Sequence, residues 1–178
     1  VKEKDSAAYI MANLAGNKWR GNVGVRVVRT QQTTVTNVPG GENPIGQENI
    51  FGTYTPTVVK HSYTDVLPSA NIKFDLSKDL VARAAVAKTM ARADYSALVG
   101  AVNLNDQLLT GTGGNPDLKP IRSTNYDATL EWYFAPKAML SVGAFFMDMK
   151  SYVTFGTAPV SYYNNTFKKY NTYVIQTP

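Results

Sequence analysis

The sequence predicts an all-β protein, an antiparallel up-and-down transmembrane β-barrel that is present here only as a fragment of about six strands. Three observations support this class. Apolar and polar residues alternate along several segments, short and long connections alternate between those segments, and no apolar run approaches a helix span. A membrane-spanning helix needs roughly 20 apolar residues, whereas a barrel strand needs only about 9 to 11 with every second one apolar.

The clearest alternation lies in residues 125–134, after a loop that contains two prolines. One face of this predicted strand would carry Tyr126, Ala128, Leu130, Trp132 and Phe134, and the other Asn125, Asp127, Thr129 and Glu131. A period of two residues is the mark of a sheet with one apolar and one wet side.

Five further strands are predicted from the same pattern, at residues 7–14, 19–36, 53–76, 80–92 and 139–153. The third would bend at Pro68. The fourth is the least secure because the alanine-rich residues 82–87 have good helix propensity, so a helix remains the alternative there.

The connections alternate in length. Residues 16–18, 77–79 and 135–137 are short turns, while residues 37–52, residues 93–121 and everything after residue 154 are long. Outer-membrane barrels have short periplasmic turns and long extracellular loops. We therefore expect sequential antiparallel pairing, with every short turn at one end.

Aromatic residues lie beside the short turns, at Trp19, Phe74, Trp132, Tyr133 and Phe134. In a barrel they would form a girdle at the headgroup level. They could equally be core aromatics of a soluble sandwich.

The two faces of the predicted sheet differ in chemistry. We expect one continuous apolar band containing Val23, Val25, Ile72, Leu130, Leu140 and Val142. The opposite face would line a wet lumen or meet a plug, and would carry Asn22, Arg26, Asn71, Lys73, Arg83, Asp127 and Glu131. Most of these polar residues would solvate the lumen and not contact a ligand.

Six strands leave two unpaired edges, and lipid offers no partner for exposed backbone groups. Bacterial single-chain barrels start at about 8 strands, and those that house a plug have about 22. The sequence is therefore expected to be part of a larger protein, whose N-terminal signal lies upstream.

Five blocks of the sequence also resemble, in order, the barrel of TonB-dependent outer-membrane receptors. They are residues 3–13, 21–30, 67–71, 115–120 and 145–152, and the subgroup they resemble is the Xanthomonas and Caulobacter type. The resemblance implies a partial barrel domain over residues 1–178, without the plug domain, the TonB box and the remaining strands. Residues 173–178 resemble the approach to a further strand.

The same resemblance implies a location in the bacterial outer membrane and active uptake of a scarce nutrient. The implied partners are outer-membrane lipid, a small-molecule or oligosaccharide ligand, and the TonB energy-coupling complex, reached through the plug. The subgroup favours carbohydrate over ferric siderophore. Two other functions remain open: a non-transporting outer-membrane barrel or adhesin, and a soluble all-β ligand-binding domain of lipocalin type.

Little in the sequence suggests catalysis. There is no cysteine, and His61 is the only histidine, so neither a thiolate nor a histidine-cluster metal site is expected. No nucleophile motif accompanies His61, and Gly113 and Gly114 are interpreted as flexible loop glycines. Lysine and arginine recur singly, without the aromatic motifs of nucleic-acid modules. We predict no enzyme, cofactor, metal or nucleic-acid partner.

The connection at residues 93–121 is the candidate for ligand contact. It contains aromatic and amide groups suited to sugar or peptide recognition, namely Tyr95, Asn103, Asn105, Asp106 and Gln107. Its last part is predicted to be a stiff, extended strut with a structural role, marked by Asn115, Pro116, Leu118 and Pro120.

Overall fold

The fold consists of two sheets. The computed structural model describes residues 1–39, 45–49, 52–99, 102–164 and 167–178. The main sheet contains β1 (Lys2–Ala15), β2 (Trp19–Pro39), β4 (Gly52–Asp75), β5 (Leu80–Ala91), β8 (Ile121–Ala135) and β9 (Ala138–Met149), with β3 (Ile45–Asn49) paired to β4. The small sheet contains β6 (Asn103–Asn105), β7 (Thr110–Thr112), β10 (Gly156–Asn164) and β11 (Lys169–Thr177). A short helix, α1 (Tyr95–Leu98), precedes β6.

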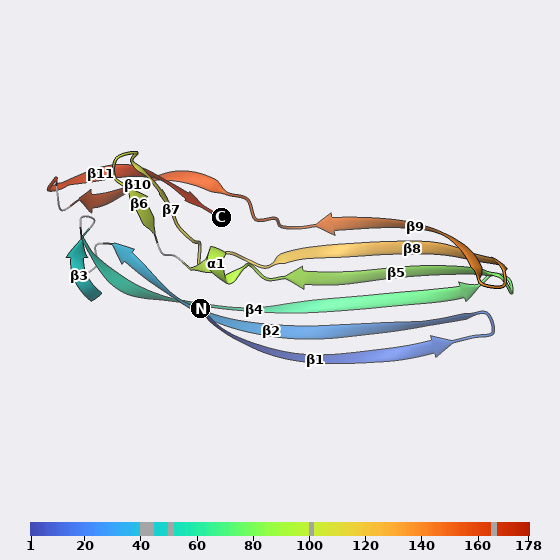
Figure 1. The fold of residues 1–178 in the computed structure, drawn as a ribbon. Helices are drawn as coiled ribbons and strands as arrows, with labels where there is room; N and C mark the ends of the chain where they lie inside the picture. Colours follow the sequence, from blue (N-terminus) through green and yellow to red (C-terminus); the bar gives the residue numbers. More distant parts are fainter. Residues whose placement is uncertain (40–44, 50–51, 100–101, 165–166) are drawn as a thin grey trace.

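The main sheet confirms the six predicted strands. Its order is β1-β2-β4-β5-β8-β9, and every neighbouring pair is antiparallel. The helix considered for residues 82–87 does not form, because these residues lie in β5. The three short turns lie together at one end of the elongated sheet, as predicted (Figure 1). Neither β1 nor β9 has a second neighbour among the described strands, so the sheet is open.

The longest strands exceed what a membrane requires. β2 has 21 residues and β4 has 24, whereas about 9 to 11 residues span the hydrocarbon core. β4 passes Pro68 without a register shift against β2, so the strand continues where a bend was predicted. The β4–β5 ladder instead stops at Ser69 and Ala87. The next residue of β4 is Pro68, which has no N–H to donate.

The register separates two faces of the main sheet as predicted. Directly paired residues share a face, and one row across the sheet contains Val23, Ala70, Val86, Tyr126 and Phe146. Strand alternation places all six residues of the expected band on this apolar face, and all seven predicted lumen residues on the polar face.

The aromatic residues beside the short turns lie on the apolar face, except at one position. Trp19 pairs with Phe74, and the rings of Trp132 and Phe134 lie 5.3 Å apart, all on the apolar face. Tyr133 was wrongly included. It alternates onto the polar face, where its hydroxyl donates to Glu131 Oε2 at 2.9 Å.

Most large apolar side chains of the main sheet are exposed. The buried hydrophobic residues of the described chain are Val28, Val81, Leu98, Tyr173 and Ile175. Three of these belong to α1 and β11, so a small core lies beneath the small sheet. This is the reverse of a lipocalin-type domain, whose apolar faces would point inward. No helix among the described residues is long and apolar enough to cross a membrane.

The small sheet was not predicted. Residues 93–121 and those after 154 were expected to be loops, yet they supply α1 and four strands in the order β10-β11-β7-β6. Residues 173–177, interpreted as the approach to a later strand, are already within β11. β7 and β11 are parallel neighbours, outside the six strands of the main sheet. In the connection at 37–52, β2 extends to Pro39 and β3 forms, while residues 40–44 and 50–51 lie outside the described part.

Candidate ligand-binding surface

One face of the small sheet is exposed and rich in hydroxyl and amide groups. We call it the hydroxyl–amide face. A row of paired residues crosses all four strands, from Asn103 through Thr112 and Gln176 to Thr157. The neighbouring residues of this face are Asn105, Thr110, Val174, Pro159, Thr172 and Ser161, and all are exposed. The face continues to the paired tyrosines Tyr163 and Tyr170, whose rings lie 5.3 Å apart. Among the described residues of this face, none has an acidic or basic side chain that is charged at neutral pH.

The hydroxyl–amide face is hollowed. A groove with a volume of about 520 Å³ is lined by Asn103, Leu104, Asn105, Thr110, Gly111, Thr112, Thr157, Val174 and Gln176. Ligand pockets commonly measure about 300 to 1,000 Å³. Beside it, the hydroxyl oxygens of Ser161 and Thr172 are 3.0 Å apart. The groove thus combines neutral hydrogen-bonding groups with the apolar residues Leu104 and Val174.

The opposite face of the small sheet fixes this surface in place. Tyr173 is fully buried, and its hydroxyl donates to Asp106 Oδ1 at 2.6 Å. Asn171 Nδ2 donates to the same oxygen at 3.4 Å. The carboxylate therefore holds the β6–β7 turn against β11. At Gly111, an added Cβ would lie 2.6 Å from Ile175 and 2.7 Å from the Asn103 carbonyl, so a larger residue has no room there.

The structure brings together four of the five candidate ligand residues. Asn103 and Asn105 lie on the hydroxyl–amide face, and Asp106 and Gln107 begin the turn that follows. Asp106 has the structural contacts just described. Asn105 Oδ1 accepts from the backbone N–H groups of Gln107 and Leu108, at 3.1 and 3.0 Å. Tyr95 lies apart from them, on α1, and is exposed.

Sequence reasoning missed the threonines and glutamine of this surface. The alternate positions on this face are Thr110 and Thr112 in β7, Thr157, Pro159 and Ser161 in β10, and Thr172, Val174 and Gln176 in β11. That alternation was a usable signal. It was overlooked because β6 and β7 have only three residues each, and because all residues after 154 were assigned to one long loop.

The connection over residues 92–120 covers the polar face of the main sheet at the end away from the short turns. Arg92 forms ion pairs with Glu3 and Asp5, each at 2.9 Å. His61 Nε2 lies 2.9 Å from Asp117 Oδ1. In the part of β2 that lies towards this end, the polar-face residues are buried, namely Val28, Thr30, Gln32, Thr34 and Thr36.

One more ion pair lies on this covered region of the polar face. Arg122 of β8 pairs with the buried carboxylate of Asp65 on β4, reaching across β5. The contact between His61 and Asp117 likewise joins the connection to the sheet.

The proline-containing segment differs from the predicted strut. Pro116 and Asp117 form a turn, in which Asn115 Oδ1 accepts from the Asp117 N–H at 3.0 Å. Asparagine before proline is a favourable turn start, because the asparagine side chain can bond to the backbone two residues on. Leu118 is partly buried and Pro120 is buried. The expectation of a fully extended segment was therefore wrong.

Asn115 also ties this turn to its surroundings. Its backbone N–H donates to Ala97 O at 2.7 Å, and its Nδ2 donates to Pro178 O at 3.2 Å. Gly114 is not merely flexible, since an added Cβ would lie 2.0 Å from Val99 O. The segment therefore joins α1, β11 and the start of β8.

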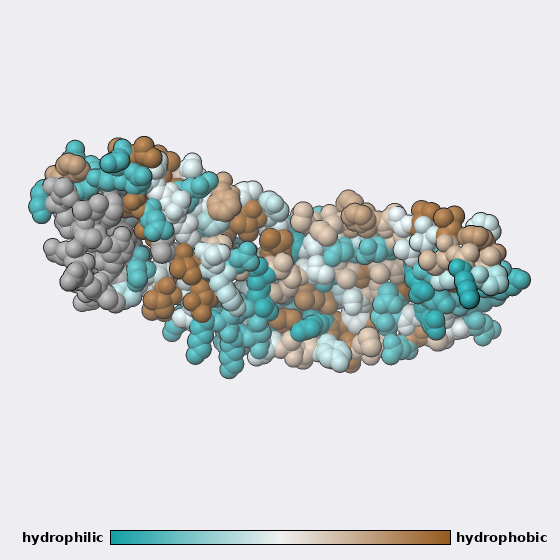
Figure 2. Space-filling view, viewed as in Figure 1, coloured by the Kyte–Doolittle hydropathy of each residue, from teal (hydrophilic) through white to brown (hydrophobic). Residues whose placement is uncertain are grey.

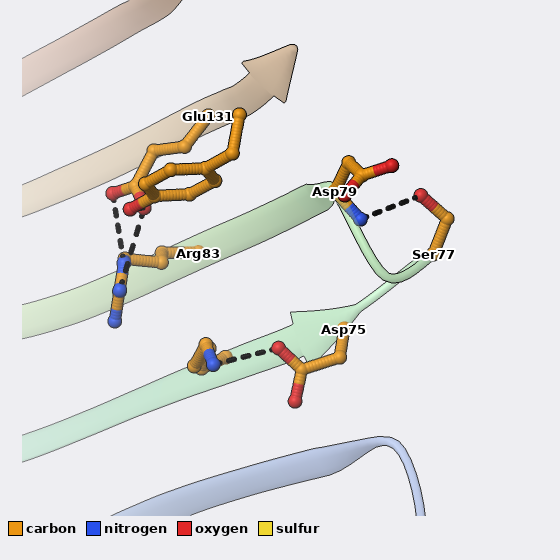
Figure 3. Close-up of polar contacts among 7 residues, drawn as sticks. Asp75, Ser77, Asp79, Arg83 and Glu131 are labelled. Atoms are coloured by element: carbon orange, nitrogen blue, oxygen red, sulfur yellow. Dashed lines mark hydrogen bonds and ion pairs between the residues drawn. The ribbon is translucent and has the colours of Figure 1, made fainter. Parts of the chain in front are cut away.

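At the short-turn end, the polar face carries ion pairs (Figure 3). Arg83 Nε donates to Glu131 Oε1 at 2.9 Å, and Lys73 Nζ lies 2.6 Å from Asp75 Oδ1. In the adjoining turn, Ser77 Oγ accepts from the Asp79 N–H at 3.3 Å. Further along this face, Asn71 Nδ2 donates to Asn22 Oδ1 at 2.8 Å. These residues bond one another, as expected for a solvated wall.

Comparison with known proteins identifies the family to which this barrel belongs. The sequence model of the family described as TonB dependent receptor-like, beta-barrel, matches residues 1–174. The chain belongs to this family. TonB-dependent receptors are transporters and not enzymes, and are characteristic of the outer membrane. No curated protein matches the chain. For this receptor, the polar face is the lumen wall, the apolar face is the lipid side, and the small sheet belongs to the long-loop end.

Proposed function

We propose that this receptor lies in the bacterial outer membrane and imports a scarce neutral nutrient, with carbohydrate as the favoured class. The hydroxyl–amide face is the observation that carries the proposal. Its Asn, Gln, Thr and Ser side chains can both donate and accept, which suits the hydroxyl groups of a sugar. The absence of charged side chains among the described residues of this face favours a neutral ligand over an anionic one.

The position of this face supports capture from outside. It lies at the long-loop end, which in outer-membrane barrels is extracellular. The connection at 92–120 joins it to the lumen wall through Arg92 and Asp117. Ligand bound in the groove would therefore lie near the covered entrance to the lumen. Energy would come from TonB through a plug domain in the complete protein.

The experiment compares two double variants of the full-length receptor. Asn103→Ala with Gln176→Ala removes two amides from the groove, and Asn37→Ala with Gln31→Ala makes the same chemical change at exposed positions of β2. A net hydrogen bond contributes about 1 kcal/mol, or roughly fivefold in affinity. We expect the groove variant to bind neutral oligosaccharides at least about tenfold more weakly, with the control unchanged.

The readouts are calorimetric binding to a panel of neutral oligosaccharides and uptake by cells with and without TonB. Equal affinity of both variants for every sugar bound by the parent would refute the groove assignment. Binding without TonB-dependent uptake would favour the alternative, a non-transporting barrel or adhesin. Uptake of a ferric siderophore in place of sugar would refute the ligand class.

A further inference from the structure

A basic region adjoins the apolar band on the lipid side of the main sheet. The last apolar row towards the long-loop end pairs Ala8, Val27 and Val66. The next rows on the same face are Ser6–Arg29–Thr64, Lys4–Gln31–Ser62 and Lys2–Thr33–Lys60. The face therefore changes within two residues from purely apolar to basic and polar.

The positive charges on this region are not neutralised by neighbours. We call Lys2, Lys4, Arg29 and Lys60 the basic belt. All four are exposed, and none forms an ion pair within the described part of the chain. Hydrophilic side chains gather where β1 begins (Figure 2).

Acidic residues are segregated to the other face. On the same three strands, Glu3, Asp5 and Asp65 alternate onto the polar face, where Arg92 and Arg122 pair with them. Farther along the lipid side, Lys88 lies two residues beyond Val86, and the acidic Asp148 is paired with Lys150 at 2.6 Å. The lipid side near the basic belt therefore carries a net positive charge.

The lowest row of the basic belt, which contains Arg29, lies at the height of the headgroup region. Strands rise about 3.3 Å per residue and tilt by about 35–45° in such barrels, so successive rows climb roughly 5 Å. The interfacial layer of each leaflet is about 5 to 8 Å thick. Measured from the last apolar row, Arg29 falls within this layer, whereas Lys4 lies roughly 10 Å and Lys2 and Lys60 roughly 15 Å above that row. The lysine side chains would have to extend down towards the phosphate groups.

We propose that the basic belt binds the phosphate groups of anionic lipids in the leaflet that surrounds the long-loop end of the barrel. The occupant follows from charge complementarity and from direct continuity with the lipid-facing band. Guanidinium and ammonium groups are the usual partners of phosphate. This inference goes beyond ligand uptake and rests on the proposed membrane placement.

The test uses the full-length receptor in nanodiscs that mix phosphatidylcholine with fluorescent phosphatidylglycerol. The variant Lys4→Gln, Arg29→Gln, Lys60→Gln removes three charges from the basic belt. The control Lys119→Gln, Lys168→Gln, Lys169→Gln removes three exposed charges elsewhere. Each basic group near an anionic surface contributes roughly fivefold. We expect the preference for phosphatidylglycerol to fall at least about tenfold in the belt variant and to stay unchanged in the control.

Incorporation of all three proteins into pure phosphatidylcholine nanodiscs tests the membrane placement separately. The preference of the parent should also weaken in high salt, because exposed charges are screened. If the triple variant does not fold, Arg29→Gln and Arg29→Lys replace it, and only the first should lower the preference. An unchanged preference in the belt variant, or an equal loss in the control, would overturn the proposal.

Discussion

At the scale of single residues, one step along a strand decides between lipid and water. Leu130 and Thr129 are adjacent, yet Leu130 pairs with Ala82 and Val142 on the apolar face, while Thr129 pairs with Arg83 on the polar face. Local alternation was enough to predict these assignments. It failed at Tyr133, because aromaticity was weighed there above strand parity.

This parity leads to a prediction about charge insertion. Leu130→Arg should cost about 2 to 4 kcal/mol near the bilayer midplane, because an arginine on the lipid face loses hydration. Thr129→Arg should be tolerated in the wet lumen apart from mild repulsion by Arg83. Ser141→Arg, opposite Glu131 on the polar face, is a second control. Folding titrations of the full-length receptor in lipid vesicles measure the difference, and equal losses at positions 130 and 129 would reverse the face assignment.

At the scale of elements, the long connections contain regular secondary structure and are held in place by several tertiary contacts. The strands of the small sheet were not predictable from local pattern, because β7 and β11 pair residues as far apart as Thr110 and Val174. The turn at Pro116 was missed for a different reason. Proline restriction was treated as extension, whereas Asn115 at the first turn position directs the chain into a bend.

The structural role predicted for Leu118 remains compatible with the observed turn. This partly buried residue follows the turn that joins α1, β11 and β8. Leu118→Asp places a charge at that junction and should lower the amount of assembled receptor, while affinity per folded molecule stays the same. Lys119→Asp introduces the same side chain at the next, exposed position and should assemble normally. Heat-modifiable gel mobility measures assembly, and normal assembly with selectively lost binding would make the turn part of the ligand site.

At the scale of the whole molecule, polarity runs along the strand direction as well as across the sheet. The short turns mark one end and the small sheet the other (Figure 1). The paired aromatics lie at the first end, and the covered lumen wall and the basic belt lie towards the second. The alternation of connection lengths was enough to predict this orientation. The closing neighbours of β1 and β9 could not be predicted from these residues, since strand partners are set by pairing and not by local pattern.

The orientation predicts which ends are reachable from outside an intact cell. The chain contains no cysteine, so single cysteines introduced into it report on their own positions. Gln107→Cys, in the exposed turn of the small sheet, should react with a membrane-impermeant maleimide on whole cells. Lys137→Cys, in the short turn between β8 and β9, should react only after the outer membrane is permeabilised. Both proteins should label fully once they are solubilised in detergent, which controls for thiol reactivity. Labelling of Lys137→Cys but not Gln107→Cys on intact cells would mean that the barrel is inserted the other way up, and the hydroxyl–amide face could not then capture a nutrient from outside.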